Sequence, residues 1–119
     1  MSIEWKNYKG KRVMYIDYQG CKCEQDLLSV LEEEVRTLNA ATTKSLMLSN
    51  YTGASISTAY MDKVKQAGKA LSATKIEKSA LLGITGLKSI LLQGYLAFVG
   101  DKNTKAFASE SEALAWLVP

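Results

Sequence analysis

Five hydroxyl side chains in two turn-like stretches are the residues of this sequence best suited to hold a ligand: Thr52, Ser55, Ser57, Thr58 and Thr85. The start of a helix offers free backbone amides and the positive end of the helix dipole. Hydroxyls beside it can therefore hold a small anion, a phosphorylated hydroxyl or the backbone of a partner. We expect an anion or ligand crevice that includes Thr52, Thr85 and Gly86. The same residues also suit ordinary caps and turns, and that simpler interpretation stays open.

Catalytic chemistry finds little support in the sequence. The chain has no histidine, which is the usual general base of a nucleophile triad, and no Gly-Lys-Ser/Thr phosphate loop. The carboxylates of Glu32, Glu33 and Glu34 follow one another on a predicted helix, where consecutive side chains point in different directions, and we expect them on its solvent face. We therefore predict no enzyme and no cofactor. Lysine or carboxylate chemistry of an unrecognised type is the remaining alternative.

Two cysteines, Cys21 and Cys23, are separated by one residue. That spacing is too close for an ordinary disulfide, and two thiols are too few for a structural zinc site. We expect small, partly buried residues in a strand-to-helix turn and no metal. A redox pair and half of an intersubunit metal site remain as alternatives.

Length and composition predict one domain over residues 1–119. The chain is 47% hydrophobic, and no Pro-rich or Gly/Ser-rich linker divides it. The first residues lack the apolar run of a signal peptide, and no segment is apolar enough to span a membrane, so we expect a cytoplasmic protein. The net charge of +3 comes mostly from dispersed lysines, so we do not expect nucleic-acid binding.

Hydrophobic periodicity divides the chain into alternating strands and helices. Strands are predicted at 3–6, 12–18, 44–49, 79–84 and 104–108. Helices are predicted at 24–38, from Ser57 or Thr58 to Leu71, at 87–99, and after Ser109, which forms a capping box with Glu112.

This alternation predicts an α/β fold: a mixed, mostly parallel five-stranded sheet with four flanking helices. The first two strands form a hairpin, which contributes the antiparallel strand. The carboxyl ends of parallel strands meet at one edge of the sheet. We therefore expect the segments 19–21, 50–58 and 85–87 to lie together there.

Two stretches of the sequence resemble a known family. Residues 78–88 read KSALLGITGLK, an apolar helix follows, and residues 107–117 read FASESEALAWL. Together they resemble bacterial SpoIIAA-like proteins of the STAS superfamily. The resemblance implies a STAS-like fold that serves protein–protein regulation rather than catalysis.

The same resemblance implies a switch residue. Anti-sigma-factor antagonists of that superfamily carry a phosphorylated serine in an Asp-Ser-Ser-Gly motif at the start of the helix after the third strand. The matching residues 54–59 read ASISTA, without the aspartate and the glycine. Ser57 is the best candidate phosphoacceptor, with Ser55 and Thr58 beside it in the same phosphoacceptor or partner-binding site, because a helix N-terminus stabilises phosphate.

Two functions are therefore predicted as alternatives. The first is a non-enzymatic regulatory or protein-interaction domain with a protein partner. The second is a carrier of a small apolar ligand or lipid that uses the helix at 87–99. Its apolar residues are Leu91, Leu92, Tyr95, Leu96 and Phe98. The same residues also suit a core or a homodimer interface.

Overall fold

The computed structural model describes residues 2–119, so residue 1 of the predicted domain lies outside the described residues. The strands are β1 (Ile3–Tyr8), β2 (Lys11–Asp17), β3 (Ser45–Asn50), β4 (Ile76–Leu82) and β5 (Thr104–Phe107). The helices are α1 (Glu24–Ala40), α2 (Thr58–Leu71), α3 (Leu87–Val99) and α4 (Glu110–Leu117). This order confirms the predicted fold class. The largest difference in bounds is at β4, which begins three residues earlier than predicted, at Ile76.

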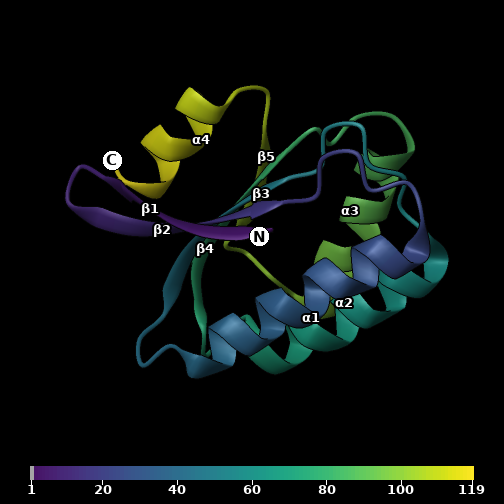
Figure 1. Ribbon diagram of the computed structural model, residues 1–119, viewed down its shortest axis with the longest axis horizontal. Helices are drawn as coiled ribbons and strands as arrows, with labels where there is room; N and C mark the ends of the chain where they lie inside the picture. The colour runs from purple at the N-terminus through teal and green to yellow at the C-terminus, as the bar shows by residue number, and fades with distance from the viewer. Residues whose placement is uncertain (1) are drawn as a thin grey trace.

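The strands lie in the sheet in the order in which they occur in the chain, from β1 to β5. β1 is antiparallel to β2, with Ile3 opposite Ile16, and every other neighbouring pair is parallel. Each parallel connection therefore steps in the same direction across the sheet. Because such strand–helix–strand connections are right-handed, connections that step in the same direction place their helices on the same face of the sheet. α1, α2 and α3 lie on that face, and α4 covers the other (Figure 1).

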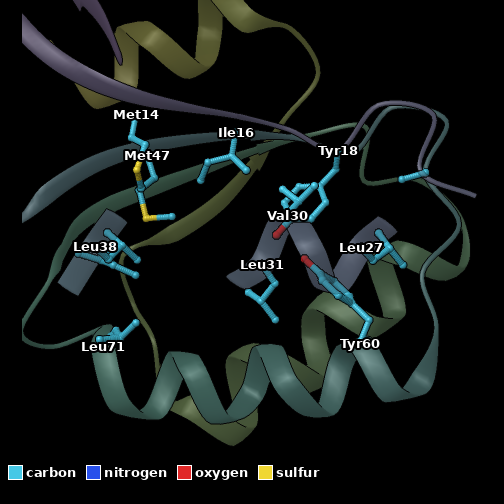
Figure 2. Close-up of a cluster of buried hydrophobic side chains, with 12 residues drawn as sticks. Met14, Ile16, Tyr18, Leu27, Val30, Leu31, Leu38, Met47, Tyr60 and Leu71 are labelled. Atoms are coloured by element: carbon cyan, nitrogen blue, oxygen red, sulfur yellow. The ribbon is translucent and has the colours of Figure 1, made fainter. Parts of the chain in front are cut away.

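The sheet separates two hydrophobic cores, because successive side chains of a strand point to opposite faces. Met14 and Met47 belong to the larger core, which packs against α1 and α2 (Figure 2). Their neighbours Val13 and Leu46 belong to the smaller core, against α4. β2 and β3 are thus buried on both faces.

Serine caps fix the starts of two helices. Ser57 Oγ accepts a hydrogen bond from the amide of Tyr60 at 3.1 Å, which makes Ser57 the cap of α2. Ser109 Oγ accepts from the amide of Glu112 at 3.3 Å, as the capping box predicts for α4. The Glu112 carboxylate accepts from the Ser109 hydroxyl at 3.0 Å.

α3 is packed less tightly than the other helices. It is rich in apolar residues, yet all of its residues keep some exposed surface, and its main packing partner is α2. Leu87 is 67% exposed and Ile90 is 69% exposed. No helix of residues 2–119 combines the length and apolarity that a membrane crossing needs.

Candidate ligand-binding cavity

A cavity of about 90 Å³ lies between the sheet and the helices α1, α2 and α3, on the side of the larger core. Most of its surface is apolar, from Met47, Ile56, Met61, Val64, Ile76, Leu81, Ile84, Leu91 and Leu92. Two of these, Leu91 and Leu92, come from α3. The predicted apolar helix at 87–99 therefore forms one wall of the cavity.

Small strand residues leave the space that the cavity occupies. Ser49 of β3 and Ser79 of β4 are 3% and 7% exposed, and both line it. Both serines lie on the face of the sheet that α1, α2 and α3 cover. A leucine or isoleucine at either position would occupy part of the cavity between the sheet and α3. The other polar residues of the lining are Glu34, Tyr51, Tyr60, Lys88, Tyr95 and Thr104.

Glu34 lies in the cavity wall, which corrects the prediction that the run of three glutamates faces solvent. The buried stripe of α1 includes Leu27, Leu31 and Leu38. Glu34 is three residues after Leu31 and four before Leu38, so it occupies a position of the stripe itself. This spacing is the signal by which the sequence could have distinguished Glu34 from Glu32, which is exposed.

The environment of Glu34 favours its protonated form. The Tyr18 hydroxyl donates a hydrogen bond to Glu34 Oε1 at 3.0 Å. Burial raises the pKa of Glu34 to about 7, although the hydrogen bond from Tyr18 acts to lower it. A carboxyl group with such a pKa changes charge near neutral pH.

Tyrosines surround this carboxyl group. The rings of Tyr18 and Tyr51 are stacked with centroids 4.5 Å apart, and Tyr60 meets Tyr18 edge to face at 5.7 Å. The hydroxyls of Tyr51 and Tyr60 are 2.8 Å apart and share a hydrogen bond. Burial raises the pKa of all three phenols above the ordinary value, so they stay neutral. Figure 2 shows the hydroxyl ends of Tyr18 and Tyr60 turned toward one another.

Three contacts hold α3 to the rest of the molecule: a hydrogen bond near its start, a packing contact with α2, and a cation–aromatic contact near its end. The Lys88 ammonium donates a hydrogen bond to the backbone carbonyl of Tyr51 at 2.9 Å. Tyr95 packs against Gly68 of α2, and a Cβ at Gly68 would lie 2.5 Å from Tyr95 Oη. Near the helix end, the Lys69 ammonium lies 4.4 Å from the centre of the exposed Phe98 ring.

The segments predicted to meet at the strand ends lie together. The Ser55 amide donates to the Cys21 carbonyl at 2.9 Å, and the Tyr51 amide donates to the Leu82 carbonyl at 2.9 Å. Thr52 and Thr85 line one surface depression there, separate from the cavity. The Thr52 hydroxyl donates to Asn50 Oδ1 at 2.7 Å.

The other predicted site residues lie outside both hollows. Ser57 is half-buried as the cap of α2, whereas Ser55 and Thr58 are exposed. Gly86 precedes α3 with a φ of +57°, a conformation that favours glycine.

The two cysteines are free thiols. Cys21 is half-buried against the larger core, and Cys23 is exposed at the start of α1. Among residues 2–119, histidine, cysteine and acidic side chains form no group of three that could hold a metal ion.

Comparison with known proteins gives a likeness of fold. No family model and no curated protein matches the sequence. An uncharacterised protein of the DUF3478 family with a SpoIIAA-like fold, from Shewanella loihica, is 16% identical, with a TM-score of 0.71. The match covers 97% of this chain and 91% of that one.

A second solved structure supports the same assignment. It is an anti-sigma-factor antagonist (STAS) domain protein from Planctomyces limnophilus, 12% identical, with a TM-score of 0.65. The match covers 98% of both chains. The chain therefore has the SpoIIAA-like fold of STAS domains, as its sequence predicts.

Proposed function

We propose that this chain is a non-enzymatic binding domain that holds a small, mainly apolar molecule between its sheet and α3. The observation that carries the proposal is the cavity itself, where apolar side chains of two strands and two helices converge with a few buried polar groups. Ligand sites commonly combine a mostly apolar lining with a small number of such groups.

The size of the cavity sets the size of its occupant. At about 90 Å³ it is smaller than an engineered cavity of about 150 Å³ that binds benzene. A molecule of four or five heavy atoms fits without rearrangement. A longer chain requires α3 to move away from the sheet, and α3 is suited to this because all of its residues keep exposed surface.

The test is a titration with 1-butanol followed by amide chemical shifts. We expect the amides of Leu91, Leu92 and Ser79 to shift, with a Kd in the millimolar range, about −4 kcal/mol for a ligand of this size. Replacing Leu92 by tryptophan should fill the cavity and abolish the shifts. Ile90→Trp is the matched control, because Ile90 is on the same helix but 69% exposed.

Three results would count against this proposal. Wild-type protein without localised shifts would mean that the cavity holds only water. Equal binding by the Leu92→Trp and Ile90→Trp variants would put the binding site elsewhere. A ligand-free dimer detected by native mass spectrometry would favour a homodimer interface over a ligand site.

The second candidate function is a regulatory protein-interaction domain switched by phosphorylation. The STAS domain neighbour, described as an anti-sigma-factor antagonist, favours it, as does the position of Ser57 at the N-terminus of α2. A phosphoryl group at this helix end would be stabilised by the dipole and the free amides.

Mass spectrometry of the protein isolated from its native host tests this candidate. Phosphate on Ser57, and its loss in a Ser57→Ala variant, is the expected result. Ser55→Ala is the control, because Ser55 is exposed two residues before the cap. Unmodified Ser57 under all growth conditions would remove the switch and leave the ligand-binding function in place.

A further inference from the structure

The Glu34 carboxylate has no compensating positive charge in the part of the chain that the structure describes. Burial raises its pKa, and the Tyr18 hydroxyl is the group that lowers it. Lys88, the one cation among the residues that line the cavity, donates instead to the Tyr51 carbonyl at 2.9 Å. Glu34 is half-buried, and a carboxylate held partly away from water without a cation is costly, so a bound cation would stabilise it.

The residues that line the cavity with Glu34 are almost all uncharged. Tyr18 donates a hydrogen bond to Glu34, and the neutral tyrosines Tyr51, Tyr60 and Tyr95 line the same cavity. β3, β4 and β5 contribute only uncharged residues to the lining, and Lys88 of α3 is its one positively charged member.

The tyrosines add to the attraction. Tyr51, Tyr60 and Tyr95 line the same cavity as Glu34. An aromatic ring attracts a cation over its face, and a phenol oxygen accepts a hydrogen bond from an ammonium group. A carboxylate together with several tyrosines is a chemical environment that suits an organic ammonium ion.

We infer that the ligand of this cavity is a small alkylamine in its protonated form. Its ammonium group binds the Glu34 carboxylate, and its hydrocarbon packs against Leu91 and Leu92 of α3. This inference rests on the proposed function, because it names the class of ligand for the same cavity.

Binding releases up to one proton to the solvent, and the amount depends on pH. Below pH 7 the carboxyl group is protonated, and the alkylamine arrives as a cation. The carboxyl group loses its proton to the buffer and forms an ion pair with the ammonium, so charge and atoms balance. Affinity should therefore rise between pH 6 and pH 8.

Calorimetric titration with n-butylamine, with 1-butanol as its neutral counterpart, tests the inference. At pH 8, n-butylamine should bind at least about tenfold more tightly than 1-butanol, since a charge-assisted contact replaces a neutral one. Titrations in two buffers of different ionisation enthalpy should show that binding releases more protons at pH 6 than at pH 8, because a raised pKa leaves more of the carboxyl group protonated at the lower pH.

Charge-neutral variants separate the role of Glu34 from a general effect of charge. Glu34→Gln should weaken n-butylamine binding about tenfold and leave 1-butanol binding within about twofold. Glu32→Gln removes the same charge from the exposed face of α1 and should change neither. Thermal unfolding of each variant verifies that it is folded.

The outcomes distinguish this inference from the proposal on which it rests. Equal affinities for the two probes, unchanged n-butylamine binding in Glu34→Gln, or tighter binding of butyrate would overturn the ammonium ligand alone. If neither n-butylamine nor 1-butanol binds, the proposed function fails together with the inference.

Discussion

Glu34 is an acidic residue on the stripe of α1 that faces the larger core. In the free protein its carboxyl group lies in a mainly apolar wall, with one hydrogen bond from Tyr18. Its pKa of about 7 lies above the ordinary value of 4.5. The folded state therefore binds a proton more tightly than the unfolded state does, and stability becomes dependent on pH.

A Glu34→Gln variant tests this dependence. Because the pKa of Glu34 is raised in the folded state, its protonation stabilises the fold. This stabilisation is fully present below pH 4.5 and is lost as the pH rises through 7. The wild type should thus lose up to about 3 kcal/mol relative to Glu34→Gln between pH 4.5 and about pH 7.5. Urea denaturation at several pH values measures the difference.

Glu32→Gln is the control, because that carboxylate is exposed. A difference between wild type and Glu34→Gln that stays constant with pH would contradict the raised pKa.

The sequence predicted the helix caps better than the half-buried position of Glu34. Ser57 caps α2, as one of the two alternatives predicted, Ser57 or Thr58, and Ser109 caps α4 as expected, because local spacing determines a cap. Glu34 was missed because its neighbours Glu32 and Glu33 suggested a solvated run. The cavity also depends on the small side chains of Ser49 and Ser79. A serine in an apolar strand does not indicate which helix packs over it, so the sequence did not predict the cavity.

Among the elements, α3 has the most unusual surroundings. Its sequence predicts a helix over 87–99, and the structure has these bounds. An apolar helix of this kind usually lies in a core, but here it packs mainly on α2 and leaves Leu87 and Ile90 exposed. Periodicity defines where such a helix begins and ends, whereas its distance from the sheet depends on residues of other strands.

Two glycines on α2 and α3 test how α3 is held. Gly94→Ala should stabilise the protein by up to about 1 kcal/mol, because a Cβ at Gly94 has no described atom within 4 Å and alanine favours a helix. Gly68→Ala places a Cβ 2.5 Å from Tyr95 Oη, so Tyr95 must move. We expect this variant to be less stable than Gly94→Ala by about 1–3 kcal/mol.

Chemical denaturation of both variants provides the comparison. Equal stabilisation by the two substitutions would show that Tyr95 does not hold α3 against α2.

At the scale of the whole molecule, one sheet joins two cores. The alternation of strand and helix patterns was sufficient to predict this sheet. It did not predict that three helices would share one face, which follows from the strand order. The residues of β2 and β3 contribute to both cores, as Val13 and Met14 do, so neither core can unfold while the other keeps its sheet.

Coincident unfolding transitions are therefore expected. In a Trp5→Phe variant, fluorescence would report on Trp116, which packs against Phe107 on the α4 face. Far-UV circular dichroism would report mainly on α1 and α2. Both signals should give the same urea midpoint. Two separate midpoints would show that the two faces unfold independently.

The strand order also has a consequence for synthesis of the chain on the ribosome. Strands that follow one another in the sheet as in the sequence can be added one at a time to a growing edge while the chain emerges. Glu34 leaves the ribosome early, and α3 leaves late. Leu91 and Leu92 of α3 belong to the cavity wall, so the wall is completed only after most of the sheet has been synthesised.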